Sequence, residues 1–299
     1  MALDRVEYSL NGQTYLLAKD LSDGMWKASG TAPTKSSFSQ KDHKYESVLK
    51  AYDQAGNVTT VDRNDSVFGE NMLIDVNEKV PPVITPLLPG AGAYLTSHSV
   101  EIQFDVTDND SGVDPDTISL QVDKEIMSGL TKNQIAGGYR CSCTATLEDG
   151  GHTLSIGVRD NDGNAAGQKT GAFTVDTVPP ELNVPTPADG LITNKQDGVV
   201  TGITNDATSA PVTVQIRLNG VDQGAVTVGG NGSFAKNITY QEGVNEIYVK
   251  ATDRAGKYSE VTLTVICDMT APVVHSVKII PNPVGAGEQF TIIADITDE

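Results

Sequence analysis

The sequence predicts an all-β protein, a linear array of β-sandwich modules, from two observations. Apolar and polar residues alternate in several segments, and in SVEIQFDVTD at 99–108 one face of the expected strand carries Val100, Ile102, Phe104 and Val106. A period of two is typical of half-buried strands, whereas no long segment shows the 3.6-residue apolar period of a helix. The second observation is an internal repeat of about 100 residues, which is the size of one sandwich.

One pattern recurs without gaps as YESVLKAYDQAGN at 45–57, HTLSIGVRDNDGN at 152–164 and NEIYVKATDRAGK at 245–257. Each copy reads as a strand that ends at an aspartate, Asp53, Asp160 or Asp253, with a glycine three residues later. Because an aspartate accepts hydrogen bonds from the backbone two residues on and glycine tolerates a positive φ, a tight turn is expected. We expect the first residue of each copy to bond the neighbouring backbone, as a tyrosine corner does: Tyr45, His152 and Asn245.

Prolines predict the junctions between modules, since proline cannot donate to a strand ladder. They follow an acidic residue three times, with Asp75 before Pro81-Pro82, Asp176 before Pro179-Pro180 and Asp268 before Pro272. We therefore expect a partial module at 1–78 that lacks its first two strands, complete modules at 79–177 and 178–269, and the first two strands of a further module at 270–299. In the last segment, Phe290, Ile292, Ala294 and Ile296 alternate onto one face.

The two partial modules allow two interpretations. The chain can be an excerpt of a longer repeat array. Alternatively, the tail of one chain completes the first module of the next by donor-strand pairing, which would give a head-to-tail polymer.

The Asp-x-x-Gly-Asn turn, the junction DTVPP at 176–180 and the stretch DNDSGVDPDTISLQVD at 108–123 resemble tandem bacterial immunoglobulin-like repeats of secreted and cell-surface proteins. The resemblance covers most of the chain and implies a linear array of immunoglobulin-like β-sandwich modules. It implies a spacer, a stalk or an adhesive module, and it supplies no catalytic residues.

Acidic residues crowd one loop and one turn of the second module: Asp105, Asp108, Asp110, Asp114, Asp116, Asp160 and Asp162. Converging carboxylates can bind Ca²⁺, which takes six to eight oxygen ligands. The EF-hand pattern fails, however, because Gly112 stands where the third ligand is needed. We assign no metal ligand, and it stays open whether Asp108, Asp110, Asp114, Asp160 and Asp162 converge on calcium.

The other chemistry-bearing residues favour structural roles. Tyr52 is out of phase with its buried neighbours, so it is the residue expected to offer an exposed ring to a sugar. Trp26 aligns with Tyr139 and Phe234, which predicts a core position. Cys141 and Cys143 are expected to face the core without a disulfide, and Cys267 is remote from both. Motifs of zinc and serine hydrolases are absent from the sequence, so we expect no enzyme activity, no catalytic residue and no cofactor.

The net charge of −18 argues against nucleic-acid binding. No apolar run is long enough to enter a membrane, and the start of the sequence lacks a signal peptide.

We expect a non-catalytic structural or adhesive stalk segment of an extracellular bacterial surface protein, whose signal peptide and anchor are not in this segment. The alternatives are a spacer or carbohydrate-binding region of a secreted hydrolase and a phage virion or tail protein. The expected partners are host or cell-surface proteins or glycans, and the expected state is a monomeric rod of about 110–130 Å.

Overall fold

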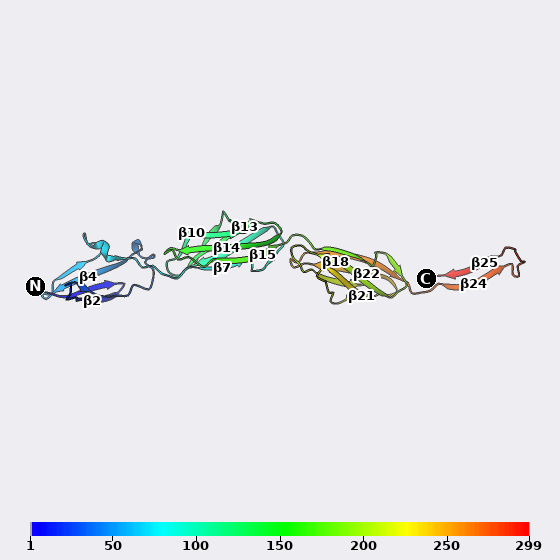
Figure 1. Cartoon of the computed structure of the whole chain (residues 1–299), viewed down its shortest axis with the longest axis horizontal. Coiled ribbons are helices and arrows are strands. Elements are labelled where there is room, and N and C mark those ends of the chain that lie inside the picture. The colour runs from blue at the N-terminus through cyan, green and yellow to red at the C-terminus, as the bar shows by residue number, and fades with distance from the viewer. Residues whose placement is uncertain (1, 299) are drawn as a thin grey trace. The chain divides into compact units, whose positions relative to one another are not determined.

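The computed structural model describes residues 2–298 and confirms the all-β fold (Figure 1). These residues form 25 strands and two short 3-10 turns, η1 (Lys41–His43) and η2 (Gly69–Met72). None of the helical segments within residues 2–298 has the length and apolar character that a membrane-crossing helix needs.

The chain divides into two compact units, which are described separately. Unit one comprises the described residues up to 93 together with 98–173, and unit two comprises residues 94–97 together with those from 174 onward. The module boundaries predicted near 79, 178 and 270 divide the chain more finely, and they stay predictions.

The N-terminal part of unit one is a sheet in the order β3-β2-β1-β4-β5, with β6 paired to β4. Its strands are β1 (Leu3–Leu10), β2 (Gln13–Lys19), β3 (Trp26–Lys27), β4 (Tyr45–Asp53), β5 (Val58–Val61) and β6 (Leu73–Ile74). β1 and β2 are joined by a tight hairpin turn, in which Asn11 and Gly12 both have positive φ.

The rest of unit one is a two-sheet sandwich, with β12-β13-β9-β7 facing β11-β10-β14-β15. Its strands are β7 (Val83–Leu88), β9 (Ser99–Thr107), β10 (Val113–Val122), β11 (Glu125–Ile126), β12 (Thr131–Ile135), β13 (Gly138–Thr146), β14 (Gly150–Asp160) and β15 (Lys169–Val175). The alternating residues of β9 form its core with Leu120 of β10 and Ile156 of β14, all of them almost fully buried. The alternation read from the sequence is therefore the inward face of β9.

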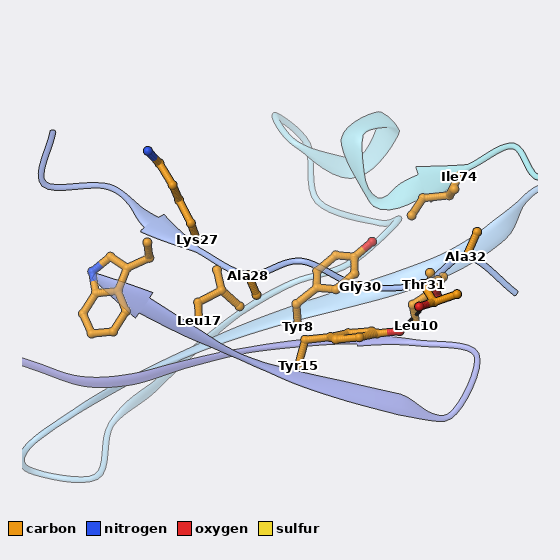
Figure 2. A pocket seen from close by; sticks show the side chains of 11 residues that line it. Tyr8, Leu10, Tyr15, Leu17, Lys27, Ala28, Gly30, Thr31, Ala32 and Ile74 are labelled. Carbon is orange, nitrogen blue, oxygen red and sulfur yellow. Dashed lines mark hydrogen bonds between the residues drawn. The ribbon is translucent and has the colours of Figure 1, made fainter. Parts of the chain in front are cut away.

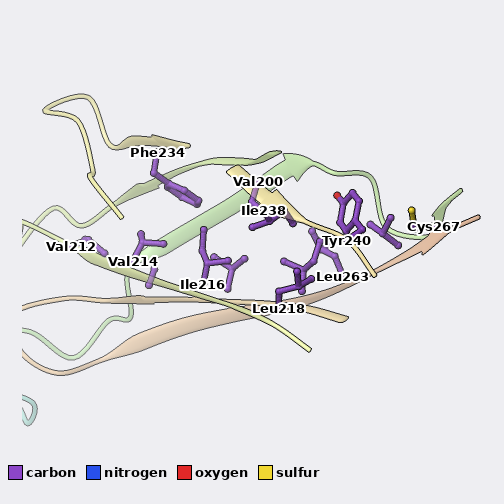
Figure 3. Packing of buried hydrophobic residues seen from close by; sticks show 14 residues of the cluster. Val200, Val212, Val214, Ile216, Leu218, Phe234, Ile238, Tyr240, Leu263 and Cys267 are labelled. Atoms are coloured by element: carbon purple, nitrogen blue, oxygen red, sulfur yellow. The ribbon is translucent and has the colours of Figure 1, made fainter. Parts of the chain in front are cut away.

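Unit two repeats this architecture, with β16-β18-β21 facing β17-β23-β22-β19-β20. Its strands are β8 (Tyr94–Leu95), β16 (Glu181–Thr186), β17 (Leu191–Thr193), β18 (Asp197–Asn205), β19 (Thr213–Leu218), β20 (Val221–Asp222), β21 (Ser233–Thr239), β22 (Gly243–Thr252) and β23 (Tyr258–Cys267). The short strand β8 pairs in parallel with the end of β15. Figure 3 shows Val200 and Ile238 of the first sheet packed toward Ile216 and Leu263 of the second. This cluster is the core of unit two.

The last described strands, β24 (Val273–Ile280) and β25 (Thr291–Thr297), form an antiparallel hairpin. It repeats the antiparallel pairing of β7 with β9 and of β16 with β18. The apolar face expected from Phe290 to Ile296 is present but exposed, and Phe290 itself precedes β25.

Candidate metal centre

The repeated aspartate turn has the predicted geometry at all three positions. It follows the equivalent strands β4, β14 and β22, and the glycines Gly56, Gly163 and Gly256 have φ of 87°, 90° and 86°. In the first copy, Oδ1 of Asp53 accepts hydrogen bonds from the backbone N–H groups of Ala55 at 2.8 Å and of Asn57 at 2.9 Å. The aspartate therefore fixes the turn through its first oxygen, as expected.

The second carboxylate oxygen of this aspartate distinguishes the third copy from the other two. In the first two copies the residue four positions on is asparagine, and its side-chain amide donates to Oδ2, at 2.8 Å from Asn57 to Asp53 and at 2.8 Å from Asn164 to Asp160. In the third copy this residue is Lys257, whose backbone N–H bonds Oδ1 of Asp253 at 2.9 Å. Oδ2 of Asp253 is buried and has no hydrogen-bond partner.

Three strand ends bring the carboxylate of Asp253 against two more carboxylates. Asp176 directly follows β15, Asp206 directly follows β18, and Asp253 directly follows β22. One oxygen from each lies within 4.8 Å of the others. The three residues are only 0%, 9% and 7% exposed, so water screens their charges poorly.

The two companion carboxylates are positioned by hydrogen bonds of their own. Oδ1 of Asp206 accepts the backbone N–H groups of Thr208 at 2.8 Å and of Ser209 at 2.6 Å. Asp176 accepts the backbone N–H of Val178 at 3.2 Å, and its other oxygen accepts the hydroxyl of Ser209 in a short contact. These bonds hold both carboxylates toward Asp253.

Three ionised carboxylates in this group would repel one another. Burial raises the pKa of the Asp253 carboxyl, and the charges of Asp176 and Asp206 raise that pKa further, against the lowering effect of the turn N–H groups. Among residues 2–298, no lysine, arginine or histidine nitrogen is found in an ion pair with these three aspartates. A cation of matching size would remove this repulsion.

Unit one contains the equivalent group, formed by Glu78, Asp108 and Asp160, whose oxygens also lie within 4.8 Å of one another. Here Oδ2 of Asp160 is bonded to Asn164, and Oε1 of Glu78 accepts the backbone N–H of Ser111 at 2.7 Å. Glu78 is also less buried than its counterpart Asp176. The two groups therefore match in position and differ in how far protein donors already satisfy them.

Of the five aspartates whose convergence on calcium was left open, only Asp108 and Asp160 belong to this group. The other three accept backbone N–H groups: Asp110 from Ser36 at 3.0 Å, Asp114 from Asp116 at 3.0 Å, and Asp162 from Glu78, a member of the group, at 2.8 Å. Asp105 is instead paired with Arg140 at 2.8 Å.

Glu78 was missed because Asp75 was taken as the acidic residue of its junction. Asp75 lies 3.9 Å from the ammonium of Lys44 and does not join the group. The available signal was the spacing to proline, since Glu78 precedes Pro82 by four residues, as Asp176 precedes Pro180.

The prediction that Tyr52 offers an exposed ring is wrong. Tyr52 is half-buried, the guanidinium carbon of Arg5 lies 3.8 Å from its ring centroid, and its hydroxyl donates to Glu7 at 3.2 Å. A sugar would have to displace Arg5 from that face.

The core prediction for Trp26 is also wrong, because Trp26 is only half-buried. It lies in β3, which pairs with β2, whereas the supposed equivalents Tyr139 and Phe234 lie in β13 and β21, which pair with β9 and β18.

Trp26 lines an open groove of about 520 Å³ on the sheet of β1 and β2. Tyr8 and Tyr15 line the same groove (Figure 2). The β1 position Tyr8 corresponds to Leu120 in β10 and Ile216 in β19, both of which are buried in sandwich cores. The groove therefore lies on the inward face of this sheet, and the register of β1 places Tyr8 at a core position.

The corner hydrogen bonds predicted for the start of the repeat are confirmed for His152 and Asn245, whereas the Tyr45 hydroxyl donates to the carbonyl of Lys35, ten residues earlier, at 3.3 Å. The ring of His152 contacts the carbonyl of Glu148 at 2.8 Å and the carboxylate of Asp123 at 2.7 Å. Asn245 bonds both backbone groups of Gln241, four residues earlier, at 2.8 and 2.7 Å. These contacts tie the loop before the strand to the strand itself.

The three cysteines are free thiols. Cys141 and Cys267 are fully buried, and burial raises the pKa of the Cys141 thiol to about 11. Cys143 is only half-buried, so it faces the core less completely than expected. None of the three belongs to either carboxylate group.

Two family comparisons agree with this fold. Residues 99–177 match the family described as bacterial Ig-like domain, and residues 180–269 match the family described as glucodextranase, domain B. The chain carries tandem immunoglobulin-like domains of the kind found in bacterial proteins.

Individual relatives are more distant. Bacillopeptidase F of Bacillus subtilis is 25% identical over 213 residues, which cover 71% of this chain and 14% of that protein. Among solved structures, the fibronectin(III)-like modules of Clostridium thermocellum CbhA are 16% identical with a TM-score of 0.39, covering 62% of this chain and 94% of that one. Titin domains A168–A170 are 16% identical with a TM-score of 0.40, covering 87% and 86%.

Proposed function

We propose that this chain is a non-catalytic accessory segment of an exported bacterial hydrolase, in which its immunoglobulin-like modules space other domains. The single observation that supports this role most is the pair of consecutive family matches, which are separated only by residues 178–179. One of these families is named after a domain of a glucodextranase, and the match to bacillopeptidase F extends over 71% of the chain.

This role is preferred to a stalk of an adhesive surface protein, the function that the sequence alone favoured. Both roles use the same modules, but the named relatives are a glucodextranase and a peptidase, which are hydrolases. Carbohydrate binding by this chain is not part of the proposal, because Tyr52 is covered by Arg5 and the aromatic groove belongs to an inward sheet face.

The proposal is tested with the purified chain in two assays. It is expected to hydrolyse neither casein nor dextran, and hydrolysis above that of a mock preparation would contradict the non-catalytic role. Small-angle X-ray scattering is expected to give a maximum dimension of about 110–130 Å, the value for modules of about 35 Å joined end to end. A compact, spherical profile would contradict the spacing role.

A further inference from the structure

We propose that Asp176, Asp206 and Asp253 bind one divalent cation, with calcium as the preferred ion, at the strand ends of unit two. The inference does not depend on the proposed hydrolase context, because it uses only contacts within unit two. The cation would lie against the three carboxylate oxygens that approach within 4.8 Å.

The unpartnered oxygen of Asp253 is the observation that points to a ligand. Asp253 is 7% exposed, and its Oδ2 has no donor although it is buried. Buried polar atoms almost always have a partner, so one that lacks it needs an explanation. A cation bound between the carboxylates supplies the missing partner.

The sequence of the third repeat explains why this oxygen is free. The first two copies end in Gly-Asn, and both asparagine amides bond Oδ2 of their aspartate. The third copy ends in Gly-Lys, and Lys257 leaves Oδ2 without an amide. The exchange of one side chain therefore frees a ligand atom at a position where two other carboxylates already converge.

The donor set favours a hard cation. Each of the three residues offers a carboxylate oxygen, the ligand that Ca²⁺ takes at 2.3–2.6 Å, usually with waters completing the shell. Mg²⁺ needs a tighter octahedral arrangement at about 2.0–2.1 Å and keeps more of its waters. The two Asp206 and Asp176 carboxylates are already oriented by backbone N–H groups and by Ser209, so little rearrangement is required.

Calorimetric titration of the full chain, freed of metal with EDTA, tests the proposal. Addition of CaCl₂ is expected to reveal one site with a Kd below about 1 mM, within the range of extracellular calcium modules. Asp253→Asn should abolish this binding. Absence of binding up to 10 mM CaCl₂, or binding unchanged in Asp253→Asn, would overturn the proposal.

A pair of substitutions at Lys257 separates ligation from an effect on folding. Lys257→Asn restores the amide that occupies Oδ2 in the other repeats, so it is expected to weaken calcium binding at least tenfold. Lys257→Ala removes the same positive charge without supplying an amide, so it should bind calcium as the native chain does or more tightly. Equal weakening in both variants would overturn the role of the free oxygen, and tighter binding of MgCl₂ than of CaCl₂ would overturn the assignment to calcium.

Discussion

Replacing Asn245 by alanine is expected to destabilise unit two by about 3 kcal/mol. Asn245 is fully buried, and its amide makes four hydrogen bonds. Its oxygen accepts from Gln241 N at 2.8 Å and from the side chain of Asn219 at 3.1 Å, while its nitrogen donates to the carbonyls of Gln241 at 2.7 Å and Gly243 at 3.0 Å.

The magnitude follows from the groups that alanine leaves without a partner. Each buried donor or acceptor that loses its partner costs about 1–3 kcal/mol. The N–H and C=O groups of Gln241 and the C=O group of Gly243 lose their partner. Because this loop is exposed, water partly replaces the lost hydrogen bonds, so the lower end of the range applies to each group. Their sum is about 3 kcal/mol, which corresponds to a roughly 100-fold change in the unfolding equilibrium.

Thiol labelling measures this change separately for the two units. Cys267 is fully buried in unit two and Cys141 is fully buried in unit one, so each reacts only after its surroundings open. In Asn245→Ala the labelling rate of Cys267 should rise about 100-fold, while that of Cys141 stays constant. The conservative exchange Asn245→His, which copies His152 of unit one, should cost less.

A Cys267 labelling rate within threefold of the native value, together with an unchanged urea midpoint, would contradict this prediction. The corner hydrogen bonds would then contribute little to the stability of unit two.

Three further predictions concern unit one and the state of the chain. Burial lowers the pKa of His152, but its bonds to Asp123 and to the Glu148 carbonyl outweigh that effect and raise the pKa above the usual value. This pair therefore stabilises unit one fully below about pH 6 and loses its contribution as pH rises through the folded pKa. Urea unfolding at pH 6 and pH 9 should show that loss, and His152→Asn should not. Gly138→Ala should destabilise unit one by more than 2 kcal/mol in the same assay, since its Cβ would lie 2.0 Å from the Val106 carbonyl oxygen, whereas Gly151→Ala, in open space, should be neutral. Light scattering after size exclusion should give the monomer mass at all concentrations, and a mass that grows with concentration would instead support head-to-tail assembly.

Local sequence determined those parts of the structure that were predicted correctly. The strands around Phe104 and Ile247 follow from a period of two, and the turns follow from aspartate and glycine at fixed spacing. The corner contact of His152 was also predictable, because its partner lies only four residues away in the chain.

The carboxylate group of unit two was not predictable in the same way. Asp176, Asp206 and Asp253 lie in three separate segments, and only the pairing of the strands brings their ends together. The acidic loop around Asp110 was more conspicuous in the sequence, but its carboxylates bond backbone N–H groups: Asp108 that of Gly112, Asp114 that of Asp116 and Asp110 that of the distant Ser36. Local density of acidic residues was therefore a poor guide to convergence.

The two aromatic predictions failed because face and register were inferred from single residues. Tyr52 lies out of phase with Leu49 and Ala51 as expected, yet Arg5 of the neighbouring strand β1 covers its ring. Trp26 matched its supposed equivalents by spacing from a glycine, but the strand that carries it pairs differently.

The most direct test of the account is the calcium dependence of Cys267 labelling in the native chain. At a free Ca²⁺ concentration 100 times the Kd, binding to the folded state alone should stabilise unit two by about 2.7 kcal/mol. Cys267 is then expected to react about 100-fold more slowly, while Cys141 is unaffected. An unchanged Cys267 rate, or equal protection of both thiols, would contradict a cation site formed by Asp176, Asp206 and Asp253.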